Sequence, residues 1–461
     1  MTRIAKLSKG YYVNFDDHCL YSKDNKKVAE ISKKPLEVLE YLCKHPNCYK
    51  QTEDINQYLE EGCLSSEAIR SRIYNLRETH YIIREVVTHN SSGYKYIGEK
   101  IEEVRSQESH SSDSNTKDTV NTVDDFIKSV DKYEADFLKS IMYCSCKWGA
   151  CTFDDTPQNT NTCEGAFALL LSSQKEKYDD IIDDAIDYLA HECTENGLKS
   201  KSLDEETVVP TAMFLYLCNK LNRYEDIIMP IAKHLWEARS NNGWGIYVRN
   251  MGKHSNIGCT YWALTGLKGL PCVPQSEFQK QLKSLYKYED SYAFGKTVDD
   301  ISPRIPSLYS TAMMYIIYDF LSEDSKKKIG TRYNHSMAIN YIVENFDNPF
   351  FLIEQEGING IEINGKTSVH TVNWNHISID YSLTAIASAI EKRVLTKNEI
   401  ELVLDRVLKV VEDNNERNQG LAFWKAPNMS IDCGNRGKMI FPTMHLLMGL
   451  LKLKSAVMNL E

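Results

Sequence analysis

Residues 243–267 read GWGIYVRNMGKHSNIGCTYWALTGL, and this stretch decides the fold of most of the chain. It begins with a turn of glycine and an aromatic residue, continues through polar residues and ends in an apolar segment with small side chains. That last segment, residues 257–267, carries no charge, so a helix formed by it has no face suited to water. We therefore expect a helix in the interior of a domain.

The same pattern occurs six times after residue 147. Its first four copies begin near Trp148, Gly197, Gly243 and Ala293, at intervals of 49, 46 and 50 residues, and the last two intervals are longer. Amphipathic helices, such as those expected at 178–193 and 223–239, fill the gaps. A period of about 50 residues with two helices in each unit is typical of a repeat array. We expect a mainly α fold, a six-hairpin α/α toroid with the apolar helices inside.

The composition is that of a globular protein with two domains. The chain has 461 residues, of which 42% are hydrophobic and 26% charged. No apolar run approaches the roughly 18 residues of a membrane span, and the first residues, MTRIAKLSKGYYVNF, lack the apolar core of a signal peptide. We expect a cytoplasmic protein with no membrane partner. Thirteen scattered cysteines favour reduced thiols over a disulfide framework.

The charge is divided unevenly along the chain. The net charge is −10, but residues 1–100 hold 16 Lys and Arg against 14 Asp and Glu, while the remaining 361 residues hold 38 against 50. A contact with nucleic acid is therefore expected from the N-terminal end, where the field repels phosphate least. Between the two parts, residues 101–124 are rich in Ser, Thr, Asn and Asp, which is typical of a linker. We divide the chain into an N-terminal domain (1–100), a flexible linker (101–124) and the toroid (125–461).

The N-terminal domain has the pattern of a winged helix-turn-helix, an α+β fold. Strands are expected on both sides of a turn at 23–25, and a hairpin at 81–98 has its turn at 90–93. Three helices lie between the strands and the hairpin. The third helix places its apolar residues at spacings of four and three, which makes one buried face. These residues are Ile69, Ile73 and Leu76.

This domain resembles the OmpR-type winged helix, the DNA-binding half of many two-component response regulators. The resemblance covers residues 8–98 and rests on KKPLEVLEYLCKHPN (33–47), SSEAIRSRIYNLRE (65–78) and SSGYKYIG (91–98). In that family the third helix enters the major groove and the wing touches the neighbouring minor groove or backbone. The resemblance implies double-stranded DNA as a partner. Its DNA-contacting residues would be Arg70, Arg72, Asn75 and Arg77 on the third helix, with Arg77 facing a phosphate, and Gly93, Tyr94 and Lys95 in the wing.

The residue pattern agrees with DNA binding in part. The three arginines lie off the apolar face of the third helix, so we expect them to be exposed, and arginine binds guanine edges or phosphates bidentately. The alternative is a winged helix that binds protein, in which the arginines form a solvated face. Glu67 and Glu78 lower the charge of the helix. A homodimer fits DNA binding, because two half-sites multiply affinity and specificity.

The C-terminal array, residues 125–461, resembles the toroid of terpenoid cyclases and protein prenyltransferases. Besides the six-fold period, the resemblance rests on the segments 242–245 and 420–424, which are similar to the Gln-Trp motifs of that family. The chain lacks a cavity-facing Asp-x-Asp-Asp, the acid of the cyclases that start by protonation. Asp179, Asp180 and Asp183 spell Asp-Asp-x-x-Asp, which holds diphosphate through magnesium in ionising synthases. They lie on an amphipathic helix of the outer type, so we expect a solvated face instead.

A zinc site is also weighed and set aside. Prenyltransferases use an Asp-x-Cys pair, whereas Asp432 and Cys433 are adjacent here. Cys433, Cys259 and His376 have the chemistry of a zinc site, but no spacing supports it. Cys144, Cys146 and Cys151 lack a second pair, so we expect ordinary thiols. We expect no metal, no cofactor and no set of catalytic residues.

Polar residues before the inner helices are the candidates for a ligand pocket, since the mouth of a toroid's cavity would lie there. Each of them alone could also be a helix cap or a loop residue. The candidates are His254, Asn256, Arg304, His370, Asn373, Trp374, His376, Asp432 and Arg436, with Glu164, Glu205, Glu206, Asp299 and Asn435 as further members of the set. His370, Trp374 and His376 fall directly ahead of an apolar helix expected at 377–390.

The function that these observations favour is a DNA-binding transcriptional regulator whose toroid senses a small molecule or a protein partner. A ligand that prefers one arrangement of the toroid would shift the population of the DNA-competent state. One alternative is a toroid enzyme, a prenyl or terpenoid-type transferase or lyase, localised by its winged helix. Another is a protein-interaction module in a defence-like system. Of these three functions, the regulator is preferred, and we expect no enzyme activity.

Overall fold

The structure, a computed structural model, describes most of the chain and divides it into two compact units, residues 1–116 and 117–461. Each unit is described by itself. The described residues are 2–7, 11–23, 26–45, 50, 52, 55, 59, 66–90, 93–96, 102–104, 122–143, 147–154, 156–200, 205–249, 255–287, 291–295, 306–358, 362–363, 366–367, 372–427 and 429–460. Among them, no helix has both the length and the apolar composition of a membrane span.

The N-terminal unit combines an antiparallel sheet, helices and a separate hairpin. The sheet has the order β4-β3-β2-β1-β7, with β1 Thr2–Lys6, β2 Tyr12–Asn14, β3 Cys19–Tyr21, β4 Lys27–Glu30 and β7 Glu102–Val104. The helices are α1 Lys33–Lys44, α3 Ser66–Thr79 and α4 Tyr81–Val86, and the hairpin is β5 Val87–Asn90 with β6 Gly93–Tyr96. The predicted apolar face of the third helix is confirmed, since Ile69, Ile73 and Leu76 are buried.

The boundaries of the predicted linker need correction. We expected a linker over 101–124, but residues 102–104 form β7 and pair with β1. At the other end, helix α5 begins at Thr122. The composition of this segment did not reveal either element, because short polar sequences pair with an existing strand edge without an apolar pattern of their own. Residues 105–121 lie outside the described residues.

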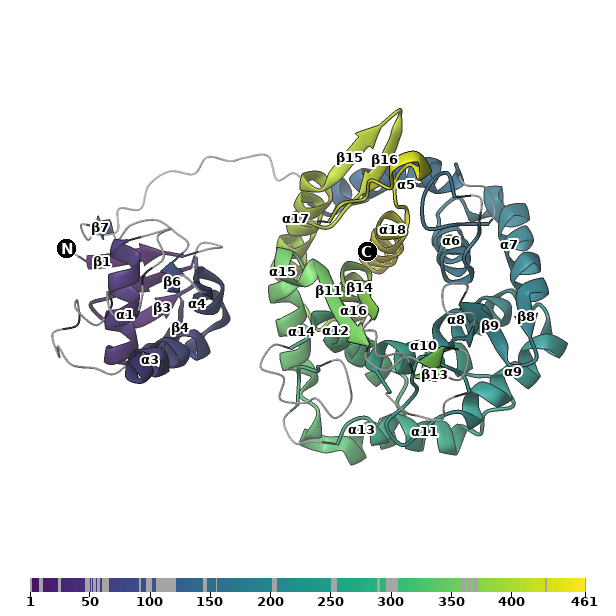
Figure 1. The fold of residues 1–461 in the computed structure, drawn as a ribbon, viewed down its shortest axis with the longest axis horizontal. Coiled ribbons are helices and arrows are strands. Elements are labelled where there is room, and N and C mark those ends of the chain that lie inside the picture. Colours follow the sequence, from purple (N-terminus) through teal and green to yellow (C-terminus); the bar gives the residue numbers. More distant parts are fainter. Residues whose placement is uncertain are drawn as a thin grey trace. The chain divides into compact units, whose positions relative to one another are not determined.

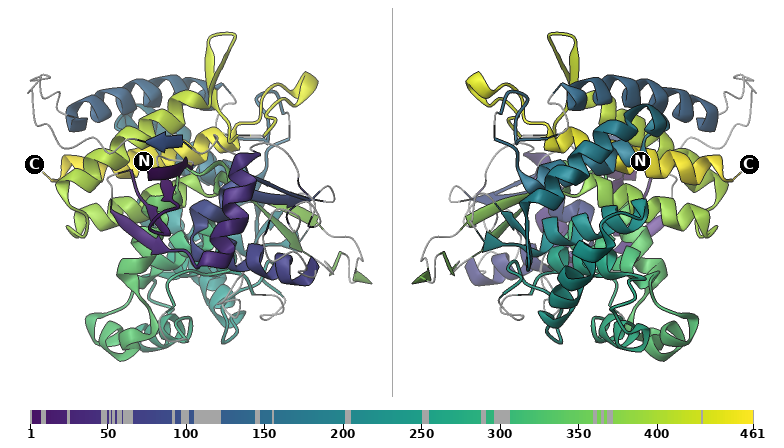
Figure 2. Two further views of the ribbon diagram at one scale, coloured as in Figure 1. Left: turned by 90° about the vertical axis from the view of Figure 1, so that its left-hand side faces the viewer. Right: turned by 90° about the vertical axis from the view of Figure 1, so that its right-hand side faces the viewer.

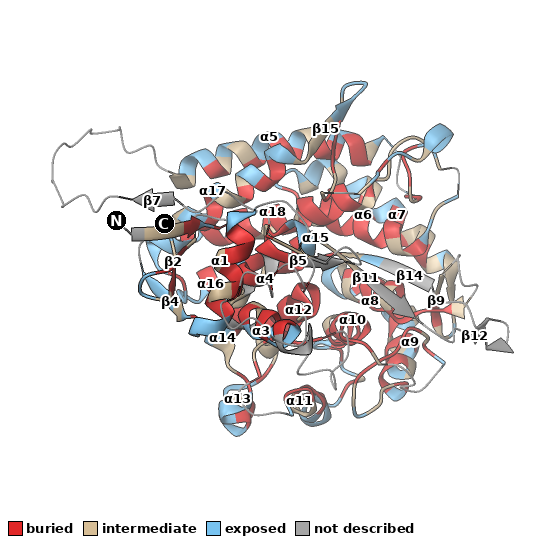
Figure 3. Ribbon diagram, turned by 60° about the vertical axis from the view of Figure 1, so that its left-hand side comes forward, coloured by how far each residue is buried: buried red, intermediate tan, exposed pale blue. Residues whose placement is uncertain are grey.

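Six apolar helices form a closed ring in the helical unit (Figure 1). Each inner helix packs against the next one along the chain, and the last packs against the first. They are α6 Asn159–Leu171, α8 Val208–Leu221, α10 Ile257–Leu267, α12 Leu308–Tyr318, α16 Ile379–Glu391 and α18 Phe441–Met458. Their side chains are largely buried, as expected of helices without a polar face (Figure 3). The prediction of a mainly helical ring is confirmed for this unit.

Amphipathic helices surround this ring and bury one face against it. They are α5 Thr122–Met142, α7 Asp179–Glu192, α9 Glu225–Glu237, α11 Gln275–Ser284, α13 Glu323–Ile329, α14 His335–Asn345, α15 Pro349–Leu352 and α17 Lys397–Asp413. Short strands connect the layers: β8 Cys193–Thr194, β9 Gly197–Ser200, β10 Glu205–Glu206, β11 Ile353–Ile358, β12 Glu362–Ile363, β13 Lys366–Thr367, β14 Val372–Ile377, β15 Asn415–Asn418 and β16 Leu421–Trp424. The β15–β16 hairpin projects from the unit (Figure 2).

A pair of hydrogen bonds at the glycine-aromatic turns connects the two layers. The indole of Trp244 donates to the carbonyl of Leu235 near the end of outer helix α9 (2.7 Å). The backbone N–H of Trp244 donates to the hydroxyl of Thr260 in the first turn of inner helix α10 (3.0 Å). One residue therefore supplies a donor to a carbonyl that has no partner within the last turn of the outer helix, and it fixes where the inner helix begins. We call this arrangement the helix clasp.

The helix clasp recurs around the ring. Trp148 and Trp424 repeat both bonds, their indoles donating to Ile141 and Val410 (2.9 and 3.3 Å). Their backbone N–H groups donate to Thr162 and Thr443. In two further units only the threonine bond is kept, from Leu198 to Thr211 and from Phe294 to Thr311. The repeated sequence pattern thus has a repeated hydrogen bond as its cause.

The glycine of the turn is required by the clasp. Gly243 has φ +102°, in the left-handed region that side chains rarely adopt. A Cβ atom at this position would also collide with the Thr260 hydroxyl. The same two conditions hold for Gly197 and Thr211.

The ring closure corrects the expectation about the cysteines. Cys151 and Cys433 form a disulfide across a sequence separation of 282 residues. They precede the first and the last inner helix, so only the closure of the ring brings them together. Local cysteine spacing carries no trace of such a pair. Among the described residues, seven cysteines are free.

Removing the clasp hydroxyl should destabilise the helical unit. Thr260→Val leaves the buried N–H of Trp244 without its acceptor, so we expect a loss of about 1–3 kcal/mol in the free energy of unfolding. Thr265→Val is the control, because the Thr265 hydroxyl on the same helix only donates to the Tyr261 carbonyl. The measurement is thermal and denaturant unfolding of both variants. Equal losses for the two variants would contradict the clasp.

Candidate functional site

A cavity of about 290 Å³ lies among the N-terminal turns of the six inner helices. Most of its lining comes from the first turns of these helices or from the residues just ahead of them. The lining residues are Gln158, Thr160, Asn161, Glu164, Ser200, Thr207, Val209, Pro210, Ile246, Asn256, Gly258, Cys259, Trp262, Tyr309, Asn375, His376, Ile377, Tyr381, Phe441 and His445. The closed ring therefore creates a site to which every inner helix contributes.

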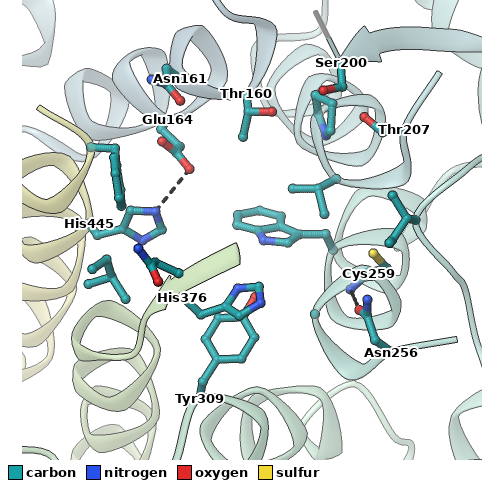
Figure 4. Close-up of a pocket in the computed structure, with 18 of the residues that line it drawn as sticks. Thr160, Asn161, Glu164, Ser200, Thr207, Asn256, Cys259, Tyr309, His376 and His445 are labelled. Carbon is teal, nitrogen blue, oxygen red and sulfur yellow. Dashed lines mark hydrogen bonds and ion pairs between the residues drawn. The ribbon is translucent and has the colours of Figure 1, made fainter. Parts of the chain in front are cut away.

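A buried histidine that is hydrogen-bonded to Glu164 forms part of the cavity wall (Figure 4), and a second carboxylate, Asp380, pairs with its other ring nitrogen. His445 of α18 lies 2.9 Å from Asp380 of α16 through Nδ1, and 3.1 Å from Glu164 of α6 through Nε2. The three residues are 8%, 5% and 7% exposed. We call them the acid–histidine triad. It connects the last inner helix to both of its neighbours in the ring.

The carboxylates hold His445 in its charged form. Burial by itself disfavours the imidazolium, but the attraction of Asp380 and Glu164, with their hydrogen bonds, outweighs it and raises the pKa of His445 to about 10. Both ring nitrogens then donate, one to each carboxylate. His445 is thus occupied by its two neighbours at neutral pH.

The carboxylates keep unused hydrogen-bonding capacity. Glu164 Oε2 and Asp380 Oδ1 are buried, and neither has a hydrogen-bond partner among the described residues. Glu164 lines the cavity, whereas Asp380 does not. An ionised carboxylate can only accept hydrogen bonds. Glu164 is therefore the carboxylate of the triad that lines the cavity, and its Oε2 atom is enclosed by the protein.

Aromatic rings form the facing wall. The indole of Trp262 donates to the Tyr381 hydroxyl (3.1 Å), and the Trp262 ring is almost perpendicular to the Tyr381 ring (79°). Tyr309 meets Tyr381 edge to face, with centroids 5.0 Å apart, and stacks on His376 at 4.4 Å. Burial and the neighbouring Asp380 raise the pKa of Tyr381 well above its usual value, so its hydroxyl stays neutral. The cavity thus combines a carboxylate with an aromatic corner.

Two of the predicted pocket residues line this cavity, Asn256 and His376 (Figure 4). Asn256 also caps α10, because its side chain accepts a hydrogen bond from the Cys259 N–H (2.7 Å). Glu164, from the wider set of polar candidates, lines the cavity as well. The sequence argument that polar residues ahead of the inner helices reach the cavity therefore holds for these three.

Two other described candidates form ion pairs, and two belong to a strand. Asp432 pairs with Lys438 (3.8 Å), and Arg436 pairs with Asp154 (3.4 Å), in the segments that precede α18 and α6. Asn373 and Trp374 belong to strand β14, which pairs with β11 where we expected a loop. A strand forms there because β11 supplies its partner, with Ile358 opposite Val372, across the intervening β12–β13 pair. His254, Arg304 and His370 lie outside the described residues.

Sequence reasoning missed the centre of the site. Asp380 and His445 stand inside apolar helices, and no motif spacing relates either one to Glu164. One indication was available: a charged or titratable residue in the first turns of a helix that is otherwise apolar all round cannot face water. Trp262, Tyr309 and Tyr381 lie in the same apolar helices, and no sequence motif distinguishes them from the other aromatic residues there.

The metal and diphosphate alternatives find no geometric basis in the described residues. Asp179, Asp180 and Asp183 are exposed on outer helix α7, as predicted, and Asp183 pairs with Arg223. No group of three His, Cys, Asp or Glu side chains among the described residues could hold a metal ion. The zinc candidate Cys433 is joined to Cys151 instead.

The N-terminal candidates for DNA contact behave differently from one another. Arg70 and Asn75 are exposed on α3. Arg72 was expected to be exposed but is only 8% exposed and lies 3.9 Å from Glu37 of α1. The apolar stripe alone could not show this, because α1 packs across the flank of α3 that carries Arg72. Arg77 is half-buried; Gly93, Tyr94 and Lys95 lie in strand β6.

The raised pKa of His445 predicts a pH dependence of stability. Because the shift is upward from 6.5, its contribution is fully present below about pH 6.5 and is lost as the pH rises towards 10. Between pH 7 and 10 the unfolding midpoint should fall more steeply in the wild type than in His445→Gln. His191→Gln, at an exposed position of α7, is the control and should behave as the wild type.

His445→Gln leaves two buried carboxylates without their cation, so we also expect a loss of about 3–5 kcal/mol. If this variant fails to fold, ¹⁵N resonances of the histidine side chains in the wild type decide the matter. One buried imidazole should remain protonated at pH 8. A wild-type protein in which every histidine is neutral at that pH would contradict the charged triad.

The sequence matches no family model and no curated protein. Among solved structures, it is similar to a type II terpene cyclase, MstE, from Scytonema. The complex with geranylgeranyl dihydroxybenzoate gives a TM-score of 0.46 at 10% identity, covering 72% of this chain and 99% of that chain. The complex with merosterolic acid A gives 0.47 at 9% identity and the same coverage, and the apo form gives 0.43 at 11% identity with 73% and 100% covered. Likeness at this level neither assigns the chain to the cyclases nor transfers their chemistry to it.

Proposed function

We propose that the helical unit binds a small organic molecule in the cavity among its inner helices. The observation that carries this proposal is the acid–histidine triad, in which Glu164, a carboxylate with one unpartnered oxygen, lines an aromatic cavity. Cavities that are mostly apolar, with a few convergent polar groups, are the usual form of ligand sites. Burying three ionisable groups is costly, and apolar residues of similar size would pack the ring at less cost. Binding of a ligand would explain why ionisable groups are kept in the interior despite this cost.

We also propose that the N-terminal unit binds duplex DNA, so that the whole chain is a ligand-responsive regulator acting in the cytoplasm. Exposed Arg70 and Asn75 on α3, together with the β5–β6 hairpin that carries Lys95, support this proposal. Duplex DNA is read by a helix in the major groove, with a β-hairpin at the flank, in winged-helix proteins. A ligand that prefers one state of the helical unit would then change the affinity for DNA.

An enzyme is the second candidate, and the same Glu164 favours it. A carboxyl group in the wall of an aromatic cavity can act as a general acid or base on a bound substrate. The exposed positions of Asp179, Asp180 and Asp183 speak against a reaction that ionises a diphosphate through that motif. The two candidates differ in whether the bound molecule leaves the cavity chemically changed.

Filling the cavity should abolish ligand binding. The full-length chain, incubated with the small-molecule fraction of a cell extract, should show a raised unfolding midpoint; at a hundred times Kd a ligand adds about 2.7 kcal/mol. Val209→Phe places a larger side chain in the cavity wall and should remove this shift. Leu402→Phe, at an exposed position of α17, is the control.

Mass spectrometry of the retained molecule separates the two candidates. Recovery of an unchanged compound favours the sensor, and its conversion favours the enzyme. If neither the wild type nor the control responds to any extract, the ligand proposal is wrong.

Duplex DNA should bind the full-length chain in a salt-dependent manner. Arg70→Ala removes an exposed cation from α3, so affinity should fall for all sequences and the salt slope should decrease by about one unit if the contact is to phosphate. Lys397→Ala, an exposed cation at the start of α17, is the matched control and should change neither quantity. Retention of no duplex at low salt would end the DNA proposal.

A further inference from the structure

The cavity is lined by the carboxylate of Glu164 and by the aromatic rings of Trp262, Tyr309 and Tyr381. This combination indicates the chemical class of its ligand. Given the proposed ligand-binding function, on which this inference rests, we propose that the ligand carries a positively charged amine attached to an apolar body. The amine would meet Glu164, and the apolar body would lie against Trp262, Tyr309 and Tyr381.

The charges of the lining favour a cation over an anion. Among the described residues that line the cavity, Glu164 is acidic and none is Lys or Arg. His445 is charged but donates both of its N–H groups to Asp380 and Glu164. Glu164 Oε2 has no donor among the described residues, and an anionic group placed against Glu164 would be repelled by it. An ammonium group supplies both the donor and the opposite charge.

A further cation in the neighbourhood does not change this balance at the cavity. Lys452 lies two turns beyond His445 on α18, where its ammonium group donates to the Thr384 hydroxyl (3.3 Å) and lies 5.5 Å from the centre of the Phe167 ring. It is not among the residues that line the cavity. Its charge is directed to the Asp380 side of the triad, away from Glu164 Oε2.

The helix N-termini around the cavity could attract an anion through their free N–H groups, and some of these groups are engaged within the protein. The side chain of Asn256 caps α10, and that of Ser307 caps α12. Glu354 accepts a hydrogen bond from the Tyr309 N–H (2.8 Å), which places another carboxylate at α12. Pro210 and Pro442, in the first turns of α8 and α18, have no N–H to offer. The N-caps of α6, α8, α16 and α18 make no side-chain capping bond, so the backbone by itself does not exclude an anion. The preference for a cation therefore rests on the charge of Glu164 and on the aromatic rings.

The aromatic corner suits the same cation. The Tyr381 ring is nearly perpendicular to both Trp262 and Tyr309, at 79° and 83°. Perpendicular rings expose a π-face to the space between them, and such faces attract organic ammonium groups and the polarised C–H groups next to the charge. All three rings are at most 9% exposed, so the attraction is little weakened by water.

A matched series of small probes tests the inference on the full-length chain. The probes are 2-phenylethylammonium, 2-phenylethanol and phenylacetate, which share one apolar body and differ in the charge of the head group. Calorimetric titration should show the ammonium probe binding at least about tenfold more tightly than the alcohol, with phenylacetate weakest. Equal binding of the ammonium and alcohol probes, or a preference for phenylacetate, overturns the inference while the proposed ligand-binding function stands.

Variants then locate the preference. Glu164→Gln keeps the shape but removes the charge, so the ammonium probe should lose about tenfold while the alcohol is unchanged. Trp262→Leu removes a π-face and should weaken the ammonium probe more than the alcohol. Glu225→Gln, in the first turn of outer helix α9, is the control and should leave all three affinities as they are. A preference for the ammonium probe that survives Glu164→Gln contradicts the assigned contact.

The remaining outcomes also decide. If Glu164→Gln does not fold, the wild-type probe series is sufficient by itself. If no probe binds although the extract still raises the unfolding midpoint, the cavity accepts another ligand class and the amine inference is wrong. If neither probes nor extract have any effect, the ligand-binding function fails together with it.

Discussion

One hydrogen bond, from the backbone N–H of a turn residue to a threonine in the following inner helix, sets the geometry of the helical unit. It recurs at Trp148, Leu198, Trp244, Phe294 and Trp424. Because it fixes where α6, α8, α10, α12 and α18 begin, it places the first turns of those helices at one level of the ring. The cavity lies at that level. The glycine-aromatic turns repeated in the sequence therefore reflect this hydrogen bond, which also positions the residues of the cavity.

Closure of the ring adds what no single repeat contains. Glu164 and His445 are 281 residues apart and meet only because α18 packs against α6. Asp380 approaches from the other side of α18. The seam between the first and last repeats is thus held by charged groups in the interior and by the Cys151–Cys433 bond ahead of the two helices. A ring closed by apolar packing alone would need neither, which is why the triad points to function.

The sequence was sufficient where a pattern repeats and insufficient where distant segments meet. The inner helices followed from uncharged segments such as 257–267, and the buried face of α3 followed from the spacing of Ile69, Ile73 and Leu76. Arg72 was misplaced because its burial depends on α1, and β14 was taken for a loop because its partner β11 is remote. Of the site, Asn256, His376 and Glu164 were within reach as polar residues ahead of or early in inner helices. His445 and Asp380 could be recognised only as titratable residues in apolar helices. Their pairing with each other and with Glu164 depends on the closure of the ring.

The position of the triad also suggests how a bound ligand would change helix packing beyond the cavity. Glu164, Asp380 and His445 belong to α6, α16 and α18, so a head group held at Glu164 acts on the closing seam of the ring. Helix α5 packs along α18 and β16, and it is the first described element after residues 105–121. A bound cation would compensate the carboxylates of the seam and favour its closed state over looser ones, to the extent that it binds that state more tightly. Helix α5 thus runs from the end of α18 at which Lys454 pairs with Asp131 to the turn of Trp148 ahead of α6, so its packing connects the opposite end of the ring to the level of the cavity.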